Sequence, residues 1–172
     1  SLKDAFKLIG HVCNALDFSG QKTPHGTLSP ANVLISRSGR VKVTGIGLGL
    51  LRERLAGTAV GAHPWDAPCF TVPDTQDLYA TDMAALGVIL YELLTGQPAP
   101  RERQALLTAA AETLPGELAA VVSRCVAPEE AGAFSGFTAL KNELLQAVEV
   151  VKAKKEAGVV EGIIHRKPSS SM

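Results

Sequence analysis

The sequence predicts a mainly α-helical fold with one small β-hairpin, and three observations carry this prediction. Apolar residues recur at helical spacing in residues 2–16 and again in residues 137–151. Residues 81–95 are apolar on nearly every side, as expected of a helix at the centre of a core. Two short runs, residues 32–36 and 40–44, have the composition of strands and are close enough in sequence to pair as a hairpin.

The remaining elements follow from turn residues and apolar spacing. The first helix is expected to end near Gly20, and Ser38-Gly39 is expected to form the hairpin turn. Residues 45–73 are rich in glycine and proline without a periodic pattern, which predicts a long loop. Gly96 and Pro98 end the central helix. Further helices are expected at residues 102–112, 117–126 and 137–155, before a loose end at residues 163–172.

Composition favours a single folded domain. The chain has 172 residues with 46% hydrophobic side chains, which suits one sizeable core and excludes general disorder. The formal net charge is zero, so no global field favours nucleic acid or an anionic membrane. Apolar runs are too short to predict stable membrane insertion, and no secretory signal is visible. Cys13, Cys69 and Cys125 lack disulfide or zinc spacing, so we expect reduced thiols and a cytoplasmic setting.

The most informative motif begins at His25 and reads His-Gly-Thr-Leu-Ser-Pro-Ala-Asn-Val-Leu-Ile up to Ile35. Gly45-Ile46-Gly47 follows the second predicted strand, and Trp65-Asp66-Ala67-Pro68-Cys69 lies further along the predicted loop. The central helix then begins Asp82-Met83-Ala84-Ala85-Leu86-Gly87 and continues Val-Ile-Leu-Tyr-Glu-Leu-Leu-Thr to Gly96.

In this order the motifs resemble the C-terminal lobe of a bacterial-type serine/threonine protein kinase. The first is similar to the catalytic loop H-R-D-L-x-P-x-N-V-L-I, and the central helix to D-x-x-x-L-G-V-I-L-Y-E-L-L-T-G. The resemblance implies a protein-kinase C-lobe-like fold over residues 1–148, with the N-lobe absent from this chain. Residues 149–172 are then expected to be a C-terminal helix extension and a flexible tail.

The residues that perform chemistry in that family are replaced. Kinases place a proton-accepting Asp at the position of Thr27, a Lys at that of Ser29, and a metal-binding Asp at that of Gly45. Asn32 remains, but one neutral amide is a poor site for a hard cation. The resemblance therefore implies a pseudokinase with no catalytic residue, no metal and no cofactor.

Other positions have structural roles by resemblance. His25 matches the histidine that packs below the metal-binding motif, Ile46 stands in its Phe position, and Asp82 matches a helix-start Asp that accepts hydrogen bonds from the catalytic-loop backbone. A catalytic role for His25 or Asp82 is the less favoured alternative. The family's Arg after the loop His is Gly26 here.

A lost ion pair is implied as well. The Glu of Ala-Pro-Glu is Cys69 here, and its Arg partner matches Ala133, so an apolar contact is expected in place of that buried pair.

A protein partner or a homodimer, and no nucleic acid, is expected for such a chain, which would act as a scaffold. The candidate surface comprises Val33, Leu34, Ile35 and Ile46, which an N-lobe would otherwise cover. Residues 159–164 are an alternative cover for that surface. Two further alternatives stay open: a fragment of a larger kinase-like receptor with metal-independent nucleotide binding, and an enzyme of unusual mechanism.

Overall fold

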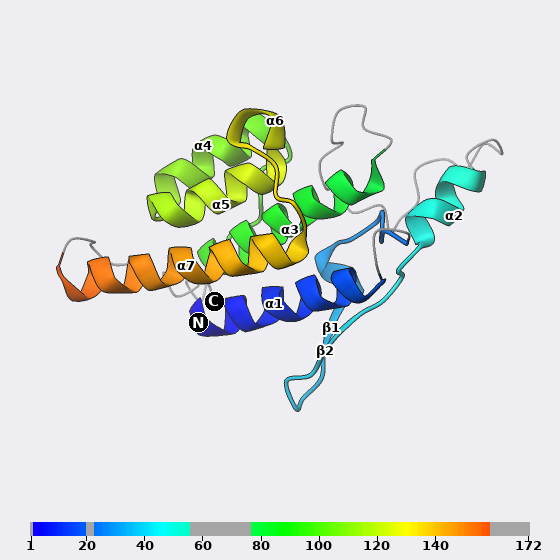
Figure 1. Ribbon diagram of the computed structural model, residues 1–172, viewed down its shortest axis with the longest axis horizontal. Coiled ribbons are helices and arrows are strands. Elements are labelled where there is room, and N and C mark those ends of the chain that lie inside the picture. Colours follow the sequence, from blue (N-terminus) through cyan, green and yellow to red (C-terminus); the bar gives the residue numbers. More distant parts are fainter. Residues whose placement is uncertain (1, 20–22, 56–76, 159–172) are drawn as a thin grey trace, which may run out of the picture.

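The computed structural model describes residues 2–19, 23–55 and 77–158 (Figure 1). Helices account for most of the described chain, and the one sheet is a two-stranded hairpin. The predicted fold class, mainly α with a small hairpin, is confirmed. In chain order the elements are α1 (Leu2–Ser19), the 3₁₀ turn η1 (Pro30–Asn32), β1 (Val33–Ile35), β2 (Val41–Val43), α2 (Leu48–Leu55), α3 (Leu78–Thr95), α4 (Arg103–Thr113), α5 (Gly116–Val126), α6 (Pro128–Ala131) and α7 (Phe137–Glu156).

Helix α3 is the centre of the core. It packs against α1 and α5, and α7 lies along α1 and α5 (Figure 1). By length and composition alone α3 is apolar enough to cross a membrane, yet every residue from Asp82 to Tyr91 is buried within the fold. Its all-round apolar character is thus that of a core helix surrounded by other helices.

Helix α3 begins three residues before the predicted start at Thr81. The side chain of Asp77 caps it by accepting a hydrogen bond from the Tyr79 N–H at 2.9 Å. At the other end Gly96 adopts a left-handed conformation with φ of 69°, and its N–H donates to the carbonyl oxygen of Glu92. The predicted stop at Gly96 is therefore correct, and the start was missed because the cap lies before the apolar run.

The hairpin forms where the sequence predicts it, with shorter strands. β1 and β2 are antiparallel, with Val33 opposite Val43 and Ile35 opposite Val41. Strand alternation puts these four side chains on one face and Leu34 with Lys42 on the other. Val33, Val41 and Val43 pack against the core, so the first face looks toward α1. The hairpin is consequently a cover for one side of α1.

Two helices depart from the sequence prediction. Residues 45–73 were expected to be a loop, but α2 occupies Leu48–Leu55 within them. The high helix propensity of the leucines and charged residues of α2 outweighs the low helix propensity of the glycine within it. The short helix α6 was also missed, because four residues are too few to show a period. The rest of the predicted loop after residue 55, and the predicted cover at residues 159–164, lie outside the described residues.

Two cysteines, Cys13 and Cys125, are buried and free. Burial raises the pKa of both thiols, that of Cys13 to about 12, so neither is a thiolate near neutral pH. They serve as small core side chains, and Cys69 lies outside the described residues.

Gly87 permits the closest approach between α3 and α5. A Cβ atom at this position would lie 2.6 Å from the Cβ of Cys125 and 2.8 Å from a methyl group of Val126. We expect Gly87→Ala to lower the free energy of unfolding by about 1–3 kcal/mol, since overpacking outweighs the better helix propensity of alanine. Chemical denaturation measures this change.

Gly10→Ala in α1 is the matched control, because a Cβ there meets only one side-chain atom, at 3.9 Å. The control is expected to be neutral or stabilising by up to about 1 kcal/mol. Equal midpoints for Gly87→Ala and the wild-type chain would contradict the assignment.

Candidate functional site

The carboxylate of Asp82 anchors the loop that joins α1 to η1. Its Oδ2 accepts the N–H of His25 at 2.7 Å, and its Oδ1 accepts the N–H of Gly26 at 2.8 Å. Asp82 is 1% exposed. Burial raises the pKa of this carboxyl to about 6. The two N–H groups favour the charged form and so lower the pKa, but burial has the larger effect. A single core side chain thereby fixes two consecutive peptide units of the loop.

His25 connects the loop to the end of the hairpin. Its Nε2 lies 2.7 Å from the carbonyl oxygen of Thr44, which only accepts, and its Nδ1 accepts the N–H of Thr27 at 3.3 Å. These partners require the neutral ring with the proton on Nε2. Burial lowers the pKa of the imidazole in agreement with that state. His25 is therefore a neutral core link.

Asn32 closes the loop on itself. Its side-chain amide donates to the carbonyl oxygen of Thr27 at 2.7 Å, and its own carbonyl accepts the N–H of Thr44 at 2.9 Å. Ser29, buried before η1, accepts the Asn32 N–H at its carbonyl oxygen. Among the residues that the structure describes, no group of three His, Cys, Asp or Glu side chains has the geometry of a metal site. Asn32 thus supports the loop conformation.

The backbone conformation of Gly45 disfavours any side chain. Its φ of 82° is left-handed, and a Cβ there would lie 3.1 Å from a methyl group of Leu48 and 3.6 Å from the His25 ring. Ile46 beside it is 37% exposed.

The start of α2 lies directly on the loop. Gly47 donates its N–H to the carbonyl oxygen of Pro24, and Gly49 donates to that of His25 at 3.1 Å. A Cβ on Gly49 would lie 2.5 Å from the Cα of Gly26, and a Cβ on Gly26 would lie 2.7 Å from the Cα of Gly49. Two glycines therefore make a backbone-to-backbone contact that no larger residue allows. Sequence reasoning missed this contact, because it predicted a loop where α2 begins.

Comparison with known proteins gives a consistent family. No family model matches the chain. Over 105 residues it is 34% identical to the serine/threonine-protein kinase PknB of Mycolicibacterium smegmatis, which covers 55% of this chain and 16% of that protein. It is 32% identical over 105 residues to the probable serine/threonine-protein kinase PknB of Bifidobacterium longum, covering 57% of this chain and 15% of that protein. The chain is protein kinase-like.

A plant relative extends the likeness beyond bacteria. The CBL-interacting serine/threonine-protein kinase 21 of Arabidopsis thaliana is 33% identical over 98 residues, which is 55% of this chain and 24% of that protein. The chain thus spans less than a quarter of the length of these kinase relatives. The mainly helical fold with its hairpin is consistent with a kinase C-lobe-like fold.

The structure brings together the residues that the sequence analysis matched to the kinase catalytic loop. Hydrogen bonds link Ser29 to Asn32, Asn32 to Thr27 and Thr27 to His25, whose own N–H donates to Asp82. Gly45 lies beside the His25 ring. The candidate interaction surface is divided instead. Val33 packs on the core, whereas Leu34 is 51% and Ile35 60% exposed on opposite faces of the hairpin. Strand alternation separates residues that are neighbours in sequence.

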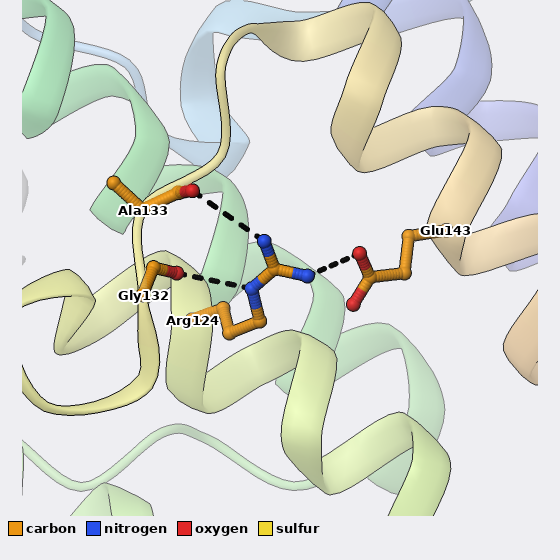
Figure 2. A network of polar contacts seen from close by, with 4 residues as sticks. All are labelled: Arg124, Gly132, Ala133 and Glu143. Atoms are coloured by element: carbon orange, nitrogen blue, oxygen red, sulfur yellow. Dashed lines mark hydrogen bonds and ion pairs between the residues drawn. The ribbon is translucent and has the colours of Figure 1, made fainter.

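Arg124 of α5 is the centre of a network of polar contacts that the sequence analysis did not predict (Figure 2). It donates from Nε to the carbonyl oxygen of Gly132 at 3.0 Å and from Nη2 to that of Ala133 at 3.4 Å, and its Nη1 pairs with Glu143 of α7. Its guanidinium also lies 4.1 Å from the centre of the Phe134 ring. Arg124 thus holds the loop between α6 and α7. The contact expected between Cys69 and Ala133 lies outside the described residues.

Asp82→Ala is expected to lower the free energy of unfolding by about 1–3 kcal/mol or more, because it leaves two loop N–H groups without an acceptor. The pKa of Asp82 rises from an ordinary 3.8 to about 6 on folding, so the folded chain binds the proton more tightly. The wild-type advantage over Asp82→Ala should therefore shrink as pH rises through about 4 to 6. Urea denaturation at several pH values measures both effects. An unchanged midpoint at every pH would refute the anchor.

Gly49→Ala is expected to push α2 away from the loop. The added methyl group meets backbone atoms of Gly26, which cannot rotate aside, and the loss should be about 1–3 kcal/mol of local stability. Hydrogen exchange at the Gly49 amide, which donates to His25, should accelerate. Gly116→Ala is the control, since a Cβ there meets nothing within 4 Å. Wild-type exchange at Gly49 in the variant would disprove the contact.

Proposed function

We propose that this chain is a catalytically inactive, pseudokinase-like module that works as a scaffold by binding other proteins. The observation that supports this most is Gly45, which by resemblance matches the metal-binding Asp, has no side chain, and has a left-handed φ of 82° that would strain any side chain placed there. Phosphoryl transfer depends on metal ions that neutralise charge on the phosphates. A chain without that ligand lacks the electrostatic part of the reaction.

The packing around the loop supports the same proposal. Thr27, at the position of the proton-accepting Asp, has its N–H turned to the His25 ring. Gly26, at the position of the family Arg, faces Gly49 and the side chain of Leu78. An arginine there would displace the start of α2. On this proposal two features make the chain inactive: the catalytic carboxylates are missing, and the backbone around Gly26 has no space for the family's arginine.

The alternative is metal-independent nucleotide binding within a larger kinase-like protein. The surviving loop scaffold is the observation in its favour, since His25, Asn32 and Asp82 keep the loop ordered. Thermal-shift titration with ATP separates the two functions. A site with ATP at about 100 times its Kd stabilises the fold by about 2.7 kcal/mol. A shift equal with and without magnesium favours the alternative, and a shift that requires magnesium contradicts the proposal.

We expect no phosphoryl transfer by the purified chain, to itself or to a generic substrate such as casein. Incubation with γ-³²P-labelled ATP and magnesium measures this directly, with the heat-denatured chain as control. The physical reason is the absence of carboxylate at Thr27 and Gly45 together. Label that scales with the amount of chain and survives a second purification would overturn the proposal.

A further inference from the structure

We propose that the exposed face of α1, between the hairpin on one side and α7 on the other, docks an acidic segment of a partner protein through two apolar hollows. This inference rests on the proposed function, because it names the surface and the chemistry of the partner for that scaffold. The two hollows share the side chains of Lys7 and His11, which form a ridge between them.

The first hollow lies where α1, the hairpin and the end of α3 meet, and has a volume of about 370 Å³. Ala5 and Leu8 of α1, Ile35 and Val41 of the hairpin, and Leu93 of α3 line it with apolar side chains. Ile35 is 60% exposed although it is on the core-facing side of the hairpin. The strand extends beyond the core here and leaves an apolar wall without a cover.

The second hollow lies between α1 and α7 and has a volume of about 220 Å³. Phe6, Gly10, Leu144 and Leu145 line it. Leu145 belongs to the apolar pattern of α7, yet it is 52% exposed at the rim of this hollow, whereas Leu144 is buried. Two concave apolar sites of side-chain size therefore flank one ridge. A partner is held well by such a surface when two apolar side chains enter it as anchors.

The charge around the hollows is positive. Lys7 and Lys141 line them, and Arg40 precedes Val41 at the rim of the first. Lys7 and Arg40 have no ion pair among the described residues. Asp4 is the one carboxylate that lines either hollow, and it already has an interaction partner within the chain.

The adjoining sequence increases this asymmetry. From Phe18 to Arg52 the chain contains five lysines or arginines and no acidic residue, so this segment, which includes the hairpin, adds no carboxylate to the face. Charge complementarity selects an acidic partner.

The shape favours a protein segment over a lipid surface. An anionic membrane attracts cations too, but it takes up apolar side chains that project, whereas here the apolar residues line hollows that receive side chains. A peptide with two aliphatic residues among aspartates and glutamates matches both features. The rim cations steer it, and the two hollows fix its register.

The test uses the full chain and fluorescein-labelled synthetic peptides in which two leucines stand among aspartates and glutamates, with varied spacing between the leucines. Fluorescence anisotropy should show saturable binding for one or more spacings. Versions with lysine for the acidic residues, or serine for the leucines, should not bind. Lys7→Glu and Arg40→Glu should each weaken binding about tenfold. Leu145→Ser should weaken it similarly.

Matched controls separate the site from general charge and exposure effects. Lys155→Glu makes the same charge change near the end of α7, and Val150→Ser makes the same polar change at an exposed position of α7 outside both hollows. Both should bind the peptide as the wild-type chain does.

Any of four results would overturn the inference, and the first three concern the peptides and vesicles. They are absence of saturable binding for every spacing, binding that Lys7→Glu and Leu145→Ser leave unchanged, and binding to phosphatidylserine vesicles without binding to peptide. A synthetic peptide of residues 159–172 that binds this face more tightly than the acidic peptides would also overturn it, and would give the face to the chain's own end. None of these results alters the phosphoryl-transfer assay, so failure here is distinguishable from failure of the inactive-module proposal.

Discussion

The two hydrogen bonds from loop backbone to the Asp82 carboxylate are the constraint on which the rest of the loop depends. Asp82 belongs to the most deeply buried helix, so it transmits the position of the core to His25 and Gly26. With the backbone of His25 fixed, its ring reaches Thr44 at the end of β2. Hydrogen bonds consequently join the loop, the hairpin and the core helix into one network that includes the Asp82 carboxylate.

That network forms although the positions that resemble those of the kinase carboxylates are Thr27 and Gly45. Hydrogen bonds that support the loop use backbone groups, His25, Asn32 and Asp82, and none of them requires an acid at Thr27 or Gly45. The energetics of the fold are therefore separable from the chemistry of phosphoryl transfer. The absence of a side chain at Gly26 has a structural consequence of its own, because it allows Gly49 of α2 to approach the loop at backbone distance.

A scaffold works through surfaces that bind other proteins, whereas a catalyst works through an active site. The face of α1 combines two apolar hollows with cations whose charge no carboxylate at the rim offsets, apart from Asp4. On the opposite side of the core, Arg124 links α5, α7 and the loop after α6 through groups that are satisfied within the chain. A satisfied network stabilises, whereas an unsatisfied charged face is available for a partner.

The sequence by itself determined the elements whose signals are local or repeated. Apolar periodicity located α1, α3 and α7, strand composition located the hairpin, and the motif around His25 with Asp82 indicated the loop and its anchor. Only the tertiary structure decided which side chains meet. Helix α2, the contact of Gly26 with Gly49, and the two hollows that share Lys7 and His11 depend on packing between segments far apart in the chain. Contacts between glycines and concave surfaces leave no periodic pattern in the sequence, because they form between residues that are close in space but far apart in the chain.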